Sequence, residues 1–160
     1  MTKLMAMSAA VAAALLLIAA GTANAAERIE SSGYDACTTD VWDELELGEG
    51  HSVALYKSRC VTFSDDPTGP GHMSTGVCAG TFEFMPDETY KGSGFCTWTY
   101  RDGDKLFLKF WEGSDMEEGR YEWIGGTGRY VGATGGGTNT GEDLTDTLWA
   151  GRFEEVIELP

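Results

Sequence analysis

The residues with the clearest potential for metal or covalent chemistry are the cysteines, of which the chain has four: Cys37, Cys60, Cys78 and Cys96. Successive cysteines are separated by 22, 17 and 17 residues, and only two histidines are present. A structural zinc site usually needs a Cys-x-x-Cys pair or histidines close to the cysteines. An even number of widely spaced cysteines in an exported chain favours disulfides instead. We expect two disulfides, no metal site and no cofactor.

The other polar candidates do not form a catalytic arrangement. His51 and His72 each adjoin a glycine-containing turn, and neither has a serine or free cysteine nucleophile placed with it. Glu83 and Arg101 fall within predicted strands, where they would orient a ligand if they pointed into a cavity and would otherwise face water. The Asp102-Gly103-Asp104 segment lacks the further ligands of a calcium loop. No catalytic residue is assigned.

The N-terminus has the three parts of a secretory signal peptide. Lys3 supplies the positive charge, Ala9–Ala20 is uninterrupted apolar sequence, and Ala23-Asn24-Ala25 fits the signal-peptidase rule. The apolar run is shorter than the roughly 20 residues of a spanning helix, which disfavours an uncleaved anchor. We therefore predict a signal peptide at residues 1–25, cleavage before Ala26, and a periplasmic or secreted protein.

The mature chain would have 135 residues, enough for one domain, and it would be strongly acidic. The formal charge of the whole chain is −15, and removal of Lys3 makes it −16. Such a charge is unlike the basic footprint of nucleic-acid-binding proteins, and an anionic membrane surface would repel it. No second apolar segment is long enough to span a bilayer. We expect neither nucleic acid nor membrane as a partner.

Alternating apolar and polar residues, separated by turn signals every ten to fifteen residues, predict an all-β domain. The expected strands are Val41–Leu47, Ser52–Phe63, Met73–Phe84, Thr89–Arg101, Lys105–Glu112, Arg120–Ile124, Arg129–Ala133 and Leu144–Leu159. Eight antiparallel strands in a chain of this size suggest a barrel or a sandwich. We expect an N-terminal segment at residues 26–40 and the β-domain at residues 41–160.

Turn positions predict how the cysteines pair. A hairpin at Met85–Glu88 places Cys78 opposite Cys96, and a turn in the Ser64–Gly71 loop brings Cys60 close to Cys78. Cys60 and Cys96 would then lie about 9–10 Å apart on either side of a middle strand, too far for a disulfide. The preferred pairing is Cys37–Cys60 with Cys78–Cys96. The alternative is Cys37–Cys96 with Cys60–Cys78.

The same turns sort the side chains between the two faces of the sheet. A hairpin centred between Asp102 and Gly103 puts one aromatic set beside the cysteines: Phe82, Phe84, Trp98, Tyr100, Phe107 and Trp111. The opposite face receives Val61, Phe63, Val77, Ala79, Phe95, Leu106, Leu108 and Phe110. Both faces are apolar, so we expect one to line a barrel interior and the other to contact a partner subunit.

The segment from Gly125 to Gly135 is rich in glycine, yet it does not match a nucleotide-binding loop. It neither opens an amphipathic helix nor contains the Gly-Lys-Ser/Thr of a P-loop. We expect a tight turn with positive φ angles formed by the structural glycines Gly125, Gly126 and Gly128. Gly132 would permit a bulge or a close backbone approach.

This glycine segment, with the sequence EWIGGTGRYVGATG at residues 122–135, resembles the signature of the allene oxide cyclase and dirigent barrel superfamily. Gly76-x-Cys78-x-Gly80-x-Phe82 and Tyr90-x-Gly92-x-Gly94-x-Cys96 are similar to small bacterial exported proteins of that kind. The resemblance implies a single eight-stranded antiparallel β-barrel with a hydrophobic cavity, often trimeric. The acids of this chain do not match the catalytic acids of the family, so its chemistry is not carried over.

We therefore predict an exported barrel that binds a small, largely apolar or aromatic molecule without transforming it. The candidate ligand-binding residues are Trp98, Tyr100, Phe107, Glu83 and Arg101. One alternative is a cyclase, isomerase or dirigent-type enzyme, which needs a buried ionisable group in the cavity. Another is a structural or interaction module with a filled barrel. A homotrimer is expected from the resemblance.

Overall fold

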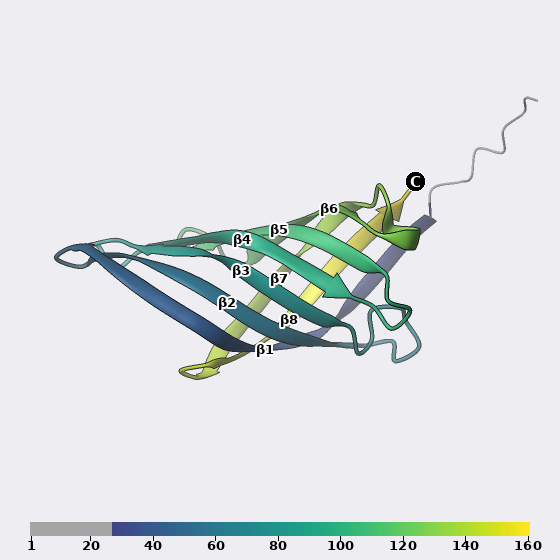
Figure 1. Cartoon of the computed structure of the whole chain (residues 1–160), viewed down its shortest axis with the longest axis horizontal. Helices are drawn as coiled ribbons and strands as arrows, with labels where there is room; N and C mark the ends of the chain where they lie inside the picture. The colour runs from purple at the N-terminus through teal and green to yellow at the C-terminus, as the bar shows by residue number, and fades with distance from the viewer. Residues whose placement is uncertain (1–26) are drawn as a thin grey trace, which may run out of the picture.

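The computed structural model describes residues 27–160, and the predicted signal peptide lies outside them. The described chain forms eight strands and one short 3-10 helix: β1 (Glu27–Gly48), β2 (His51–Ser64), β3 (Thr75–Phe84), β4 (Tyr90–Thr99), β5 (Lys105–Gly113), β6 (Gly119–Gly126), η1 (Gly128–Tyr130), β7 (Thr134–Thr145) and β8 (Leu148–Leu159). Each strand pairs antiparallel with the next, and β8 pairs with β1. The sheet therefore closes into the expected eight-stranded antiparallel barrel (Figure 1). No helix in this part of the chain is long and apolar enough to cross a membrane.

The expected strands match β2 to β6 within a few residues, and the expected strand Leu144–Leu159 begins four residues later, at Leu148 of β8. The larger differences lie in the first and seventh strands. β1 begins at Glu27, so residues 27–40, expected as a segment before the barrel, belong to its first strand. They pair with β2 on one side and with β8 on the other. This pairing holds a polar sequence in a strand, although the sequence has little β-propensity of its own.

The expected strand at residues 129–133 is wrong. Residues 128–130 form η1, and the seventh strand is the glycine-rich β7. β7 pairs with β6 and with β8. Backbone hydrogen bonding on both edges thus outweighs the poor strand propensity of glycine, which side-chain patterns cannot reveal.

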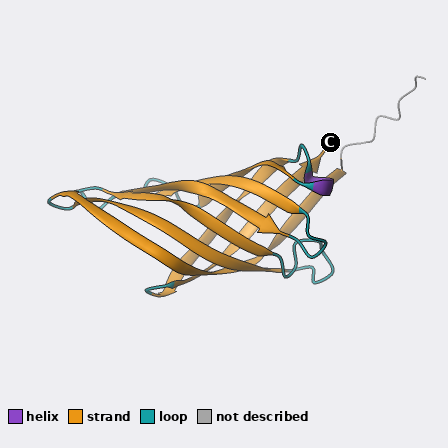
Figure 2. Ribbon diagram, in the orientation of Figure 1, coloured by secondary structure: helices purple, strands orange, loops and turns teal. Residues whose placement is uncertain are grey.

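The barrel has a closed end and an open end. The closed end carries the β2–β3, β4–β5 and β6–β7 connections, together with the C-terminus (Figure 1), and η1 lies there beside the C-terminus (Figure 2). Three large side chains at this end are almost fully buried: Leu106, Tyr130 and Ile157. The rings of Tyr130 and Tyr100 approach to 4.7 Å between centroids. Tyr130 thus plugs this end of the barrel.

Glycine and Asp104 place Tyr130 in that position. Gly128, at the start of η1, has a φ of 53° in the left-handed region that favours glycine, and the Asp104 carboxylate lies against its Cα. The same carboxylate accepts a hydrogen bond of 3.0 Å from the Arg129 backbone N–H. Gly125 and Gly132 also have positive φ, whereas the expected positive φ at Gly126 is wrong. These positions let the chain cross the barrel end between β6 and β7.

The β4–β5 register differs by one residue from the expected one. Trp98 lies opposite Leu106, and Cys96 lies opposite Leu108. The hairpin is therefore centred on Asp102, and a slip of one residue exchanges the two faces of a strand. Leu106, Leu108 and Phe110 consequently face the interior, whereas Phe107 was wrongly placed there. Trp111, near the end of β5, still reaches the cavity.

The Tyr130 plug can be tested by two substitutions. Tyr130→Ala should lower the free energy of unfolding by about 3–5 kcal/mol, as removal of a buried aromatic ring does. Tyr130→Phe should change it by less than about 1 kcal/mol, because the buried Tyr130 hydroxyl has no hydrogen-bond partner in the described chain. Urea denaturation followed by tryptophan fluorescence measures both. Similar losses for the two variants would show that the hydroxyl, and not the ring, stabilises this end.

Candidate functional site

The barrel interior contains a cavity of about 570 Å³. All eight strands contribute side chains to its wall, among them Trp42, Tyr56, Cys78, Cys96, Leu108, Tyr121, Asn139 and Glu155. Inward-facing positions alternate with outward-facing ones along each strand, which is why one closed sheet supplies the whole wall. The size is within the usual range for a small-molecule pocket.

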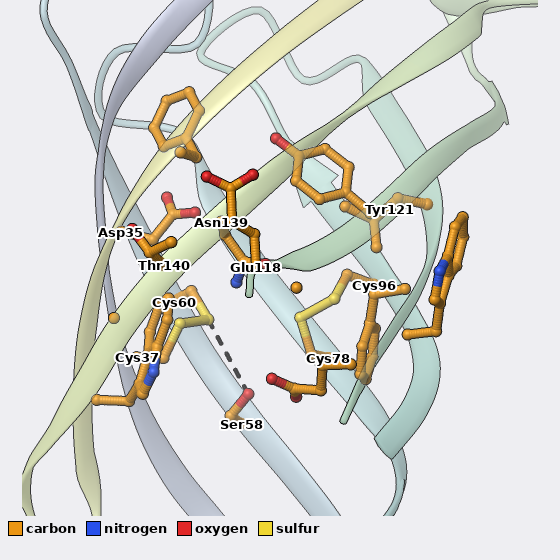
Figure 3. Close-up of a pocket in the computed structure, with 18 of the residues that line it drawn as sticks. Asp35, Cys37, Ser58, Cys60, Cys78, Cys96, Glu118, Tyr121, Asn139 and Thr140 are labelled. Carbon is orange, nitrogen blue, oxygen red and sulfur yellow. Dashed lines mark hydrogen bonds between the residues drawn. A yellow bond between two sulfur atoms is a disulfide. The ribbon is translucent and has the colours of Figure 1, made fainter. Parts of the chain in front are cut away.

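Two disulfides cross the wall of the cavity. Cys37 of β1 is bonded to Cys60 of β2, and Cys78 of β3 is bonded to Cys96 of β4. Each pair lies directly opposite in its ladder, so the preferred pairing is the one that the structure contains. Figure 3 shows both disulfides beside Ser58, whose hydroxyl lies 4.0 Å from the Cys60 sulfur. Each disulfide ties two adjacent strands together at the level of the cavity.

Towards the open end, the wall is a cluster of aromatic rings. Phe82 is central, with its ring centroid 5.1 Å from Tyr56, 5.7 Å from Trp42 and 6.2 Å from Tyr90. Tyr56 also makes an edge-to-face contact with Phe110 at 6.1 Å. These separations are those of interacting aromatic pairs. The cluster presents ring faces and edges on which a flat ligand could stack.

Deeper in the cavity, two carboxyl groups are held by hydroxyl donors. The Thr62 hydroxyl donates to Asp35 over 2.6 Å, and the Tyr121 hydroxyl donates to Glu155 over 3.1 Å. Asp35 comes from β1, Tyr121 from β6 and Glu155 from β8. Figure 3 shows Asp35 and Tyr121 projecting from different strands into the same space. The cavity wall is therefore polar as well as apolar at this depth.

Burial changes the acidity of these groups. Loss of hydration raises the pKa of Asp35 to about 6, opposed in part by the Thr62 hydrogen bond. Burial likewise raises the pKa of Glu155 to about 8, opposed by hydrogen bonds from Tyr121 and Ser31 and reinforced by the charge of Asp35. Near neutral pH Asp35 is mostly ionised, whereas Glu155 is mostly protonated. A base and an acid thus share one cavity.

The candidate ligand-binding residues divide into two groups. Trp98 and Tyr100 line the cavity. The other three candidates do not line it. Phe107 faces outward, because it lies opposite Thr97 and not opposite Trp98 as expected. Arg101 is exposed in the β4–β5 turn. Glu83 is half-exposed and bonds the His51 ring over 2.9 Å.

Asp35 and Glu155 were missed by the sequence prediction, although a weak signal exists for each. Asp35 precedes the inward-facing Cys37 by two residues and therefore shares its face. Glu155 stands between Phe153 and Ile157, which are both buried. The signal at Asp35 was not usable, because residues 26–40 were not expected to form a strand.

The positions of the histidines and of the acidic side chains can be compared with what a metal site requires. Among residues 27–160, no group of three or more histidine, cysteine, aspartate or glutamate side chains is arranged to hold a metal ion. His51 pairs with Glu83, and the His72 ring nitrogen Nδ1 lies 3.3 Å from the Ser64 carbonyl oxygen. Neither histidine lines the cavity.

Comparison with solved structures finds the same fold in proteins of very different sequence. The pterocarpan synthase dirigent protein GePTS1 is 11% identical, with a TM-score of 0.54 over 84% of this chain and 86% of that protein. A second pterocarpan synthase dirigent protein, PsPTS1, is 11% identical, with a TM-score of 0.52 over 82% and 94%. A DUF3224-family protein of unknown function from Shewanella oneidensis MR-1 is 10% identical, with a TM-score of 0.51 over 82% and 96%.

Sequence comparisons add no closer relationship. No protein-family model matches the chain. No curated protein matches it either. Identities near one in ten support a shared fold and nothing more. The chain thus has a dirigent-like barrel fold, and the allene oxide cyclase part of the resemblance stays a prediction.

The raised pKa values predict that stability falls as pH rises. In the unfolded chain these carboxyls titrate near about pH 4, so the folded state holds their protons more tightly than the unfolded state does. Their stabilising contribution is complete below that pH and is lost as pH rises through about 6 for Asp35 and about 8 for Glu155. Between about pH 5 and about pH 8, Tm should fall by several degrees, at about 4 °C per kcal/mol for a domain of this size.

Glu155→Gln should reduce this fall, because glutamine cannot ionise and still accepts a hydrogen bond from Tyr121. Glu154→Gln is the matched control, since Glu154 is exposed and does not line the cavity. Thermal unfolding at several pH values measures both. An unchanged fall in the Glu155→Gln variant would show that this carboxyl is not the cause.

Proposed function

We propose that the protein binds a small, largely aromatic molecule inside the barrel. The observation that carries the proposal is the cavity of about 570 Å³ whose wall combines stacked aromatic rings with a few hydrogen-bonding groups. Small-molecule sites are concave, mostly apolar, and contain a few polar groups that orient the ligand. A filled barrel, as a purely structural module would have, offers no such space.

The geometry favours a flat ligand. At the open end the rings of Phe82, Tyr56 and Trp42 present aromatic surface to the cavity. Asp35 and Glu155 line a deeper part of it. A planar molecule could stack on the rings and direct a polar substituent towards the carboxyl groups. Two disulfides, Cys37–Cys60 and Cys78–Cys96, cross-link strands of the cavity wall. They limit the conformational entropy that the wall loses when a ligand binds.

We further propose that the protein works after export, as the N-terminal sequence predicts. The two disulfides support this location, because such bonds persist in oxidising compartments and are rare in the cytosol. All four cysteines are used in them, so no thiol remains free for other chemistry.

Filling part of the cavity should weaken binding. Ser58 is 6% exposed and lines the cavity, so Ser58→Phe places a ring in the ligand space. Binding of flat aromatic probes such as quinoline and 2-tetralone, measured by isothermal titration calorimetry, should weaken at least about tenfold, equivalent to about 1.4 kcal/mol. Ser58→Met is a less bulky second variant with the same expected direction.

Ser93→Phe is the matched control, because Ser93 is exposed on β4 and does not line the cavity. It should leave affinity unchanged within about twofold. Failure of the wild-type protein to bind any member of an aromatic panel would overturn the proposal. Equal binding by the wild-type protein and a folded Ser58→Phe variant would do the same.

A second function, acid–base catalysis on the bound molecule, is favoured by the pair of carboxyl groups with separated pKa values. Ionised Asp35 can accept a proton from a carbon next to a carbonyl group, while protonated Glu155 donates a hydrogen bond or its proton to the carbonyl oxygen. Return of the protons completes an isomerisation with no other reactant. Such a buried ionisable group is what an enzyme of the cyclase or isomerase type requires.

Deuterium exchange tests this second function. In D₂O the wild-type protein should accelerate exchange at the acidic carbon of 2-tetralone, detected by NMR. Asp35→Asn should reduce the acceleration about 10²-fold or more, as loss of a general base does. Glu83→Gln, which alters an acid outside the cavity, should not. Binding of 2-tetralone without any acceleration over buffer would exclude this activity for ketones of that class.

A further inference from the structure

The ionisable side chains on the cavity wall are all acids or weakly acidic tyrosines. The acidic residues are Asp35, Glu112, Glu117, Glu118, Glu142, Asp143 and Glu155. None of the lysine, arginine or histidine residues at positions 27–160 lines the cavity. The basic side chains that form ion pairs, such as Arg59 with Asp40 and Arg152 with Asp65, do so elsewhere on the barrel. The cavity therefore carries negative charge that no basic side chain in its wall neutralises.

Part of this charge lies directly beside the aromatic cluster. Gly92 of β4 leaves space that is shared by the Phe82 ring and by the Glu112 side chain, whose Cγ would lie 3.1 Å from a Cβ at position 92. The charge of Glu112 raises the pKa of Tyr56, after the larger effect of burial. Glu112 and Asp143 together raise that of Tyr90, again after burial. A carboxylate and ring faces thus border the same part of the cavity.

A metal ion does not explain these acids. In the described part of the chain they are spread around the wall and do not converge as a coordination group. Carboxylates dispersed among aromatic rings suit a larger cation with delocalised charge, because ring faces attract cations and need no close ligand geometry. Around Glu112, which is half-buried, the effective dielectric is lower than in water, and this attraction is correspondingly stronger.

Trp123 is an independent observation that points to a ligand, because it places an unpaired hydrogen-bond donor in the cavity wall. It is 5% exposed and lines the cavity, and its indole N–H has no hydrogen-bond partner among the described residues. The indole N–H can only donate, and leaving a buried donor without an acceptor is unfavourable. An acceptor atom on a molecule in the cavity would satisfy it.

We infer that the ligand is a flat aromatic cation that stacks among Trp42, Tyr56 and Phe82 and is held by the carboxylates of Glu112 and Asp143. This inference rests on the proposed binding function and names the ligand class. The deeper polar groups, with Trp123, would then meet an acceptor substituent of the ligand. Neutral aromatic molecules would bind through the rings alone, and anionic ones would be repelled.

Three bicyclic probes of similar shape separate charge from aromatic stacking. N-methylquinolinium is a permanent cation, quinoline is neutral at pH near 7.5, and naphthalene-2-sulfonate is an anion. Titration calorimetry of the disulfide-bonded protein should show the cation binding at least about tenfold more tightly than quinoline, with the anion weakest. Raising the NaCl concentration from about 50 to about 500 mM should weaken the binding of the cation and leave that of quinoline unchanged.

Variants locate the effect. The double variant Glu112→Gln/Asp143→Asn should lose at least about fivefold in affinity for N-methylquinolinium and keep its affinity for quinoline. The control, Glu122→Gln/Glu154→Gln, removes the same charge from exposed residues that do not line the cavity, and should change neither affinity by more than about twofold. If the double variant does not fold, the three-probe ranking and its salt dependence in the wild-type protein decide.

The outcomes distinguish this inference from the proposed function. Equal binding of quinoline and N-methylquinolinium would overturn the inference and leave the binding function standing. Equal losses in the cavity and control variants would overturn it as well, because the effect would then come from net charge. Absence of binding by all three probes would count against both.

Discussion

The pairing of β8 with β1 is the interaction on which the rest of the structure depends. Twelve opposed residue pairs, from Glu27 with Leu159 to Thr38 with Leu148, join the first and last strands. Without them the sheet would have two open edges and no interior. Closure creates the inward faces of all eight strands at once, and with them the cavity. It also explains why a strand as polar as the first half of β1 is stable, since its backbone is bonded on both sides.

Strand pairing closes the barrel wall, and the two ends of the barrel differ in how they are packed. At one end Tyr130, carried by η1 across the opening, packs against Tyr100 and closes the barrel. At the other end the aromatic cluster lines the wall without filling the space. The result is a cup with a packed base and a hollow upper part. Packing at the base supplies stability, so that the upper part can remain empty and available to a ligand.

The charge of the interior has an energetic cost. Carboxyl groups enclosed by the barrel lose hydration, and their raised pKa values express that loss. Hydrogen bonds from Thr62 and Tyr121 compensate in part. A protein selected for stability alone would carry apolar residues there. Acids retained in the cavity at this cost are therefore expected to serve the ligand site. They would supply the proposed acid–base chemistry and the preference for a cationic ligand.

Local sequence determined much of this fold. The hairpin turn at Met85–Glu88 was enough to oppose Cys78 and Cys96, because register in a short hairpin follows from the turn. Alternation together with turn signals identified β2 to β6. The β4–β5 hairpin shows the limit of such reasoning. An error of one residue in its predicted register assigned Phe107 to the cavity face, whereas its side chain faces outward.

Tertiary structure decided what the sequence could not. The first half of β1 and most of β7 have little strand propensity, and they are strands because neighbours on both sides bond their backbones. The position of Tyr130 depends on the contact of Gly128 with Asp104, 24 residues earlier in the chain. The candidate site follows the same division. Trp98 and Tyr100 could be predicted from alternation and turns, whereas Asp35 and Glu155 face one cavity only when the first and last strands close the barrel, because pairing between chain ends leaves no local pattern.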